Sequence, residues 1–343
     1  MRYYLYNLNG LAYVDFEKPW WTQSLLETTA FGDKIYLVSG DISMGMLRYL
    51  HCTYYNMKLG EDYGFEDLYD VVLDGRWTLD MLEQLCRDKY QDIDSNGKVE
   101  HTADSFGYLL NNTTLWRAYI DALDINYFYI NDKGIPEFNF SDQRSFDVCD
   151  RFAKLLGPGS SADFYMTGTW GNAEIGNAFK NDRTIFAMGR FVDCETDYRD
   201  MKSDFAILPV PKWDEDQESY EVTINGSEST FGVPVNSSKT EYIGAVLELL
   251  AYHSYDKVTP AYYESALKIK YTRGDNVNKA AQVIDIIRNG AKFNPTVQLS
   301  KLLGSTDYMI QDAFANGTGL ASKFAKRQAE LEAKLAEVLE KIS

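Results

Sequence analysis

Apolar and polar positions follow strand-like and helix-like patterns in turn along the chain. Short apolar runs, several of them bounded by Gly, Pro or Asp, predict strands at 35–39, 46–56, 184–188, 205–211 and 231–235. Patterns with helical spacing predict helices beginning at Thr78 and over 114–123, 142–156, 173–180, 241–253 and 260–270. Residues 127–140 have the pattern of a hairpin. Strands and helices that alternate in this way indicate the α/β class.

The last 24 residues form the strongest helical pattern. Leu331, Leu335, Val338 and Ile342 recur at intervals of 4, 3 and 4, which gives one apolar face. About three heptads are short for a self-standing coiled coil. We therefore expect this helix to dock on the body of its own chain, and a partner helix is the alternative.

Length and charge narrow the range of functions. The chain has 343 residues, so we expect two lobes rather than one core. Its formal net charge of −17 repels phosphate backbones and anionic lipid, which argues against nucleic acid and membrane surfaces as partners. No window approaches the ~18 apolar residues of a membrane-spanning helix. Aromatic residues make up 14% of the chain, enough to leave some rings for a ligand such as a sugar.

The cysteines and the first residues suggest no export signal and no metal motif. Cys52, Cys86, Cys149 and Cys194 include no CxxC pair, and we expect four separate thiols; if the chain is exported, three pairings are open. The first ten residues, MRYYLYNLNG, lack the apolar region and cleavage site of a signal peptide.

Several catalytic motifs can be set aside. Gly157–Ala162 matches GxGxxA, but it follows a predicted helix. The glycine-rich turn of a dinucleotide site follows a strand instead. Ser265–Lys268 matches SxxK without the companion motifs of a serine acyl enzyme. A glycosidase would need two carboxylates about 5–10 Å apart, and the sequence marks out no pair.

One loop resembles the first half of an EF-hand. Oxygen-bearing side chains occupy positions 1, 3 and 5, a Gly occupies position 6, and a carboxylate occupies position 9. Position 12 is Ala103, and Asp104 comes one place late. A calcium loop and a solvated Asx-turn loop both remain open. The residues in question are Asp92, Asp94, Asn96, Lys98 and Glu100.

A family resemblance emerges from the order of several segments over about 300 residues. The chain resembles the extracellular solute-binding proteins of carbohydrate ABC transporters, family 1, the maltose-binding-like group. The segments that carry the resemblance are DFEKPWW (15–21), GDKIYLVSGD (32–41), TYYNMK (53–58), GRWT (75–78), DFAILPVPK (204–212), FGVPVNSSK (231–239), AVLELL (245–250), PAYYE (260–264) and LKIKY (267–271).

The resemblance implies a fold and a division of the chain. The fold would be of the periplasmic-binding-protein type II kind, with two lobes, crossover strands and an incomplete first lobe, because family members carry further βα units before the segment seen here. Residues 1–45 would be the remnant of the N-terminal lobe with the first crossover, and 46–222 the C-terminal lobe. Residues 223–296 would return to the N-terminal lobe, and 297–343 would pack back on the C-terminal lobe.

The resemblance also implies a function without chemistry on the ligand. The protein would bind a sugar or oligosaccharide between the lobes and deliver it to an ABC permease, without a catalytic cofactor. Family members are extracellular and anchored to the membrane. The ligand-binding positions it implies are Asp41, Asn111, Asn112, Thr113, Trp116, Trp170, Arg190, Phe191 and Glu228. The first alternative is a carbohydrate-active hydrolase that uses a carboxylate pair; the second is a scaffold that binds partners through the C-terminal helix.

Overall fold

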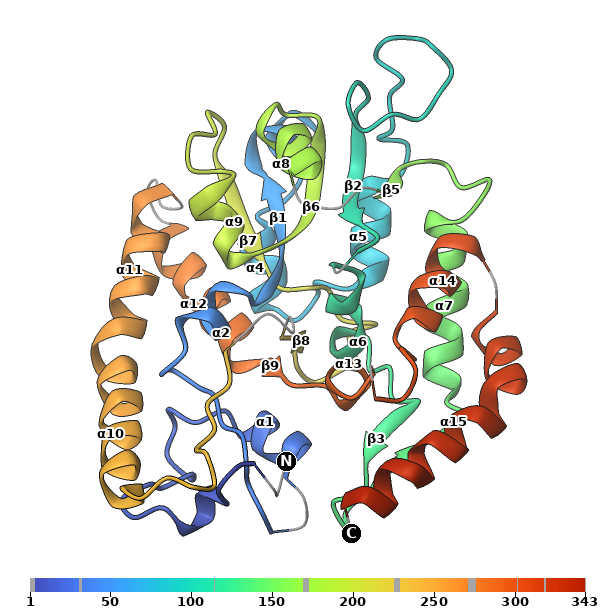
Figure 1. The fold of residues 1–343 in the computed structure, drawn as a ribbon. Helices are drawn as coiled ribbons and strands as arrows, with labels where there is room; N and C mark the ends of the chain where they lie inside the picture. The colour runs from blue at the N-terminus through green and yellow to red at the C-terminus, as the bar shows by residue number, and fades with distance from the viewer. Residues whose placement is uncertain are drawn as a thin grey trace.

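The structure, a computed structural model, describes residues 4–30, 33–113, 115–168, 173–224, 229–270, 276–300, 302–317 and 319–342. A five-stranded sheet stands at its centre, with helices on both faces (Figure 1). The strand order is β5 (Phe164–Thr167), β2 (Phe106–Asn111), β6 (Thr184–Arg190), β1 (His51–Asn56) and β7 (Phe205–Leu208).

Strand direction in this sheet follows from the connections. β2 pairs in parallel with both β5 and β6, and helices form the links between these strands. β1 is antiparallel to β6 on one side and to β7 on the other. Every residue of β1 and of β2 is buried, as expected for strands covered on both faces. The sheet is therefore mixed, with a single antiparallel strand inserted among parallel ones.

Two short pairs of strands complete the β-structure. β3 (Phe128–Ile130) and β4 (Pro136–Phe138) form the hairpin that the sequence predicts over 127–140. β8 (Val222–Thr223) and β9 (Ala291–Lys292) pair in parallel across a long sequence separation. β8 and β9 lie below the central sheet in Figure 1.

Helices of the first two-thirds of the chain surround the sheet. They are α1 (Gln23–Thr29), α2 (Met44–Arg48), α3 (Met57–Asp62), α4 (Leu68–Leu73), α5 (Leu79–Cys86), α6 (Tyr119–Ala122), α7 (Gln143–Leu156), α8 (Ala173–Lys180) and α9 (Phe191–Thr196). Two 3-10 turns, η1 (Leu8–Gly10) and η2 (Leu115–Ala118), precede or join them. Thr78 caps α5 as predicted, because its side chain accepts a hydrogen bond from the Met81 amide at 3.2 Å.

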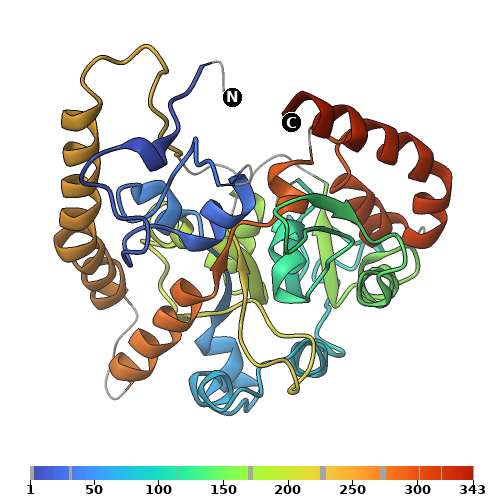
Figure 2. The same ribbon diagram turned by 90° about the horizontal axis from the view of Figure 1, so that it is seen from below.

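The last third of the chain is mainly helical. α10 (Thr240–His253), a π-helical segment (Ser254–Val258) and α11 (Thr259–Lys270) follow one another without a break. The remaining helices are α12 (Asn276–Asn289), α13 (Pro295–Gln298), α14 (Tyr308–Asn316) and α15 (Leu320–Ile342). Figures 1 and 2 place α10 and α11 on one side of the molecule and α14 and α15 on the other.

The C-terminal helix docks on its own chain, as the sequence predicts. Leu331 is fully buried in the main core, and Leu335 packs against that core. Phe324 of the same helix packs against Tyr127 and Phe140, with ring centroids 5.1 and 5.3 Å apart. The apolar face of α15 is therefore covered by the strands and helices of the chain itself.

The predicted strand over 46–56 is wrong in its first half. Residues 44–48 form α2, and β1 begins only at His51. A run that is apolar on both faces fits a buried strand and a buried helix equally well, and tertiary packing decides between them. The segments at 35–39 and 231–235 are extended but pair through single bridges, Val38 with Phe231 and Leu5 with Pro234.

Two groups of buried residues fill the interior. The large core surrounds the five-stranded sheet and includes Trp77 and Trp116, both fully buried. The small core consists of Leu8, Leu11, Trp21, Leu26, Val38, Val233 and Ala251. α1 links the two, since Leu25 belongs to the large core and Leu26 to the small one.

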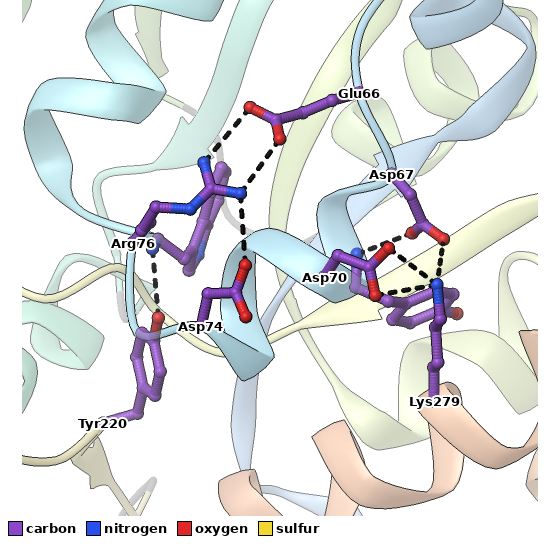
Figure 3. A network of polar contacts seen from close by, with 9 residues as sticks. Glu66, Asp67, Asp70, Asp74, Arg76, Tyr220 and Lys279 are labelled. Carbon is purple, nitrogen blue, oxygen red and sulfur yellow. Dashed lines mark hydrogen bonds and ion pairs between the residues drawn. The ribbon is translucent and has the colours of Figure 1, made fainter.

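Charged residues attach α12 to the sheet side of the molecule. The Lys279 ammonium group lies 2.9 Å from the carboxylate of Asp67 and 2.7 Å from that of Asp70, both near the start of α4 (Figure 3). In the same view the Arg76 guanidinium group bridges Glu66 and Asp74. These pairs are largely exposed, so each contributes little stability and mainly fixes orientation.

The four cysteines remain separate, as predicted. Cys52, Cys86, Cys149 and Cys194 are free and buried. Burial raises the pKa of the Cys86 thiol well above its usual value, which keeps it protonated and unreactive.

Candidate functional site

The carboxyl edge of the five-stranded sheet is the candidate site. After β2 the chain passes to β5 on one side, and β6 then lies on the other side of β2. Such a reversal leaves a crevice outside the carboxyl ends of neighbouring parallel strands, where open α/β sheets bind ligands. The strands end there at Asn111, Thr167 and Arg190. The antiparallel β1 begins there, with His51 paired to Arg190.

The segment after β2 forms a tight turn. The Asn111 side-chain oxygen accepts hydrogen bonds from the Thr113 amide, the Thr113 hydroxyl and the Leu115 amide, at 3.0–3.2 Å. Asn111 is therefore a structural residue of the turn, with only 1% of its surface exposed. Asn112 and Thr113 are half-buried, and the Asn112 carbonyl accepts a hydrogen bond from Gln311 of α14.

Trp116 lies beneath this turn and is fully buried. Its ring centroid is 6.2 Å from that of Tyr308, and the Arg117 guanidinium group lies 5.0 Å from the Trp116 ring and 5.4 Å from the Tyr308 ring. An ion pair of 2.7 Å with Asp307 fixes Arg117 in this position. Tyr308 is 46% exposed, so it is the accessible ring of this group.

Arg190 ends β6 and begins the turn into α9. Its guanidinium group lies 3.3 Å from the Asp193 carboxylate and 5.2 Å from the centroid of the Tyr49 ring. Asp193 also accepts a hydrogen bond from the Arg190 amide at 2.7 Å. Phe191 is buried, with 3% of its surface exposed. Of the two predicted residues, Arg190 is therefore half-buried at the edge, and Phe191 lies inside the core.

Three buried polar atoms near this edge have no hydrogen-bond partner in the described part of the chain. They are Thr167 Oγ1 at the end of β5, Arg190 Nε at the end of β6, and Trp116 Nε1 after β2. Neighbouring strands lie about 4.8 Å apart, so the ends of β5 and β6 are separated by about 10 Å across β2. A buried polar atom without a partner is costly, and a bound ligand is one explanation for it.

His51 and Thr223 form the floor of the edge. The His51 Nδ1 atom lies 2.7 Å from the Thr223 carbonyl oxygen, and both residues are fully buried. Burial lowers the pKa of His51 to about 4, and the positive charges of Arg190 and Arg117 add to this effect. His51 is therefore neutral at pH 7.

Asp41 lies at a junction of the chain rather than at an open surface. Its carboxylate accepts a hydrogen bond of 2.5 Å from the Thr259 hydroxyl and forms a 3.1 Å ion pair with Arg288 of α12. Only 3% of Asp41 is exposed. Burial raises the pKa of Asp41, while Thr259 and Arg288 act in the opposite direction. In this structure Asp41 joins the segment between α1 and α2 to α11 and α12.

The remaining predicted positions divide into three groups. Trp170 and Glu228 lie outside the described residues. Asn112, Thr113 and Arg190 come to the sheet edge, and Asn111, Trp116 and Phe191 support it from below. The sequence did not indicate Thr167, His51, Tyr49 or Tyr308 as residues near this edge. Thr167 could have been found as the last residue of a parallel strand, a position that often faces a ligand. Tyr308 belongs to a helix far along the chain, and no local pattern marks it.

The predicted calcium loop is partly assembled. Carboxylate oxygens of Asp92, Asp94 and Asp104 lie within 4.8 Å of one another, so two of the predicted ligands come together with the acid that follows position 12 by one residue. Backbone amides already use these oxygens: the Gly97 amide donates to Asp92 at 2.8 Å, and the Glu100 amide donates to Asp104 at 2.8 Å. Calcium binding by this loop stays a prediction.

No family model matches the chain, and no curated protein matches its sequence. Solved structures match its fold over almost the whole chain. The maltose/maltodextrin-binding domain MalE from Bdellovibrio bacteriovorus, bound to maltotriose, has a TM-score of 0.62 at 15% identity, covering 97% of this chain and 80% of its own. The galacto-N-biose-/lacto-N-biose I-binding protein of the ABC transporter from Bifidobacterium longum has a TM-score of 0.59 at 11% identity, covering 99% and 79%.

A third match widens the range of ligands. UgpB from Mycobacterium tuberculosis, in complex with glycerophosphocholine, has a TM-score of 0.56 at 14% identity, covering 98% of this chain and 80% of its own. At these identities the likeness establishes the fold. The chain has the type II fold of ABC substrate-binding proteins, as the sequence resemblance implies.

Proposed function

We propose that the protein binds a sugar or oligosaccharide at the carboxyl edge of its five-stranded sheet and delivers it to an ABC importer, without chemistry on the ligand. The observation that carries this proposal is the edge itself. It combines the reversal of strand order with buried polar atoms that lack hydrogen-bond partners among the described residues. Hydroxyl, guanidinium and indole groups are the donors and acceptors that sugar hydroxyls require.

Aromatic rings beside the edge support the same ligand class. Tyr308 is accessible, and Tyr49 is half-buried against Arg190. Matching structures with bound maltotriose or lacto-N-biose add support from the fold. Delivery to a permease and an extracellular location belong to the proposal as well. Among the described helices, none combines the length and the apolar character that crossing a membrane requires.

Thr167→Val is the sharpest test of the edge. The substitution removes one hydroxyl and retains the shape of the side chain, so the fold is expected to survive. Loss of a buried hydrogen bond to a ligand should weaken binding by about 1–3 kcal/mol, roughly 5- to 100-fold. Affinity is measured by titration calorimetry, with a sugar that a thermal-shift screen of mono- and oligosaccharides has first identified.

Thr53→Val is the matched control. The Thr53 hydroxyl is also fully buried without a partner among the described residues, but it lies in the middle of β1, opposite Met188. Its loss should leave affinity unchanged. Equal effects of both substitutions, or none from either, would contradict the assignment of the edge. Turnover of an aryl glycoside would instead favour the hydrolase alternative, which requires a pair of catalytic carboxylates.

A further inference from the structure

A separate cavity of about 680 Å³ lies away from the sheet edge. α1 forms one wall, and the β3 strand, the loop after α6 and the start of α13 form the other. α1 and β3 lie at the same end of the molecule in both ribbon views (Figures 1 and 2). The volume falls within the range of pockets that hold small organic ligands.

Asp121 of α6 lines this cavity, and one of its two carboxylate oxygens is buried without a hydrogen-bond partner among the described residues. The side chain is 7% exposed, and its Oδ1 atom accepts a 2.7 Å hydrogen bond from Asn294. Its Oδ2 atom has no partner in the described part of the chain. An ionised carboxylate oxygen that is buried without a donor carries a large desolvation cost. A ligand that donates to this oxygen would remove that cost.

The charge around Asp121 selects the kind of donor. Glu27, Asp124 and Glu221 also line the cavity, and Lys292 is the single basic residue among the described lining residues. Lys292 is already paired with Glu221. The lining therefore has a negative excess that repels anionic ligands and attracts cations.

Aromatic side chains form part of the remaining surface of the cavity. Phe128, Tyr129 and Phe293 line the same cavity. Ring faces attract an ammonium group, and their apolar area also accommodates the carbon skeleton of a ligand. Carboxylates and rings together fit an amine better than a hydrated inorganic cation, which prefers oxygen ligands alone.

The cavity and the sheet edge are distinct. Thr223 of β8 stands between them: its carbonyl contacts His51 at the edge, and its hydroxyl accepts a 3.0 Å hydrogen bond from the Asp121 amide on the cavity side. We propose that the cavity is a second binding site, for an organic ammonium ion whose NH₃⁺ group donates to Asp121 Oδ2.

The test compares amines with neutral compounds of similar size. Putrescine and glucosamine are titrated against the full chain at pH 7.5, beside 1,4-butanediol and glucose, with calorimetry and thermal shift as readouts. The amines should bind more tightly than their neutral counterparts. Asp121→Asn should weaken amine binding about tenfold or more, because it removes the charge while keeping an acceptor for Asn294.

Asp216→Asn is the charge-matched control, since Asp216 is exposed and lies outside the cavity. It removes the same charge and should leave amine affinity unchanged. Glu27→Gln changes the opposite wall and should weaken binding by less than Asp121→Asn. Equal responses of the Asp121 and Asp216 variants would show general attraction to an acidic protein and overturn the proposal. Equal binding of amines and neutral compounds would overturn it too. Sugar affinity lost in Thr167→Val but retained in Asp121→Asn would confirm that the two sites are separate.

Discussion

The large and small cores differ in how completely the surrounding helices are themselves covered. Around the five-stranded sheet, helices cover both faces, and the largest aromatic side chains are fully buried. Around the small core, α10 contributes Gly244 and Ala251 to the interior, and Ile243 and Leu247 pack against it. The opposite face of α10 is apolar as well but exposed: Tyr242, Val246, Leu249 and Leu250 are 51–72% accessible.

This difference leads us to expect different effects of substitutions in the two cores. A helix that is apolar on all sides is suited to burial on both faces, but α10 is buried on only one face. The exposed residues of α10 follow helical spacing and form a stripe, which is the surface character of an interaction site. The large core is covered on both faces of its sheet, whereas the helix that covers the small core has an exposed apolar face.

The largest effect should come from the large core. Trp77→Ala removes a fully buried ring and its 2.9 Å hydrogen bond to the Pro209 carbonyl. We expect a loss of about 3–5 kcal/mol in the free energy of unfolding, because the rigid surroundings cannot close the cavity. Urea denaturation followed by fluorescence measures it. A loss below about 1 kcal/mol would mean that the core around the sheet is loosely packed.

A smaller and pH-dependent effect is expected at the cavity between the two regions. Burial raises the pKa of Asp121 to about 6, with Glu221 acting in the same direction and Asn294, Thr223 and Lys292 against it. The folded state therefore holds this proton more tightly than the unfolded state, and stability falls as pH rises from about 4 to about 6. Asp121→Asn should stabilise the fold by up to about 3 kcal/mol at pH 7.5 and by almost nothing at pH 4.

His51 changes stability with pH in the opposite direction to Asp121. The quantity to measure is therefore the difference in the free energy of unfolding between variant and wild type. Its pKa is lowered to about 4, so its contribution to stability is lost as pH falls from about 6.5. Both proteins keep His51, and its contribution cancels in the difference. Asp216→Asn should show no such pH dependence, and a flat difference for Asp121→Asn would contradict the assigned burial.

The small core should be less sensitive than the large one. Trp21→Ala removes a ring that is 2% exposed, packs against Phe16 and donates a 3.2 Å hydrogen bond to Glu248. We expect a cost of about 1–2 kcal/mol, because a half-open core relaxes around the cavity. The comparison uses the same denaturation experiment as Trp77→Ala. A cost equal to that of Trp77→Ala would abolish the distinction between the two regions.

The smallest change in stability is expected on the exposed stripe of α10. The double substitution Val246→Lys with Leu249→Lys should alter the free energy of unfolding by less than about 0.5 kcal/mol, as exposed positions usually do. If the stripe is the surface through which molecules associate, the double substitution should also reduce self-association and the binding of a hydrophobic dye. Light scattering over a concentration series measures the self-association. A large loss of stability would show that the stripe is already covered.

Local pattern predicted most of the regular structure. Thr78 caps α5, the hairpin at 127–140 forms β3 and β4, and the apolar face of α15 docks on the chain. These features depend on near neighbours in sequence, so their signals survive without tertiary context. The run at 46–56 shows the limit, because an unbroken apolar stretch carries no period by which to separate α2 from β1.

The candidate site was less predictable. Asn112, Thr113 and Arg190, which the resemblance implies as ligand-binding positions, lie at the carboxyl edge of the sheet, and binding there stays a prediction. Trp116, which could have stacked on a ligand, is instead covered by Tyr308, which lies 192 residues further along the chain. Asp41 carries the acidic group expected at a lining position, but Thr259 and Arg288 occupy it. Which side chain stays free depends on partners that no local window contains.

The sequence by itself determined the α/β class, the place of several main elements and the acidic character of the chain, but it did not predict the strands β2 and β5 of the central sheet. Periodicity, capping residues and composition act locally or additively, and a single sequence contains them in full. Tertiary structure alone decided which buried polar atoms lack a hydrogen-bond partner among the described residues, such as Thr167 Oγ1, Arg190 Nε and Asp121 Oδ2. It also left α10 open on one face. Burial and pairing are properties of the whole packed chain, since each depends on segments that meet only after folding.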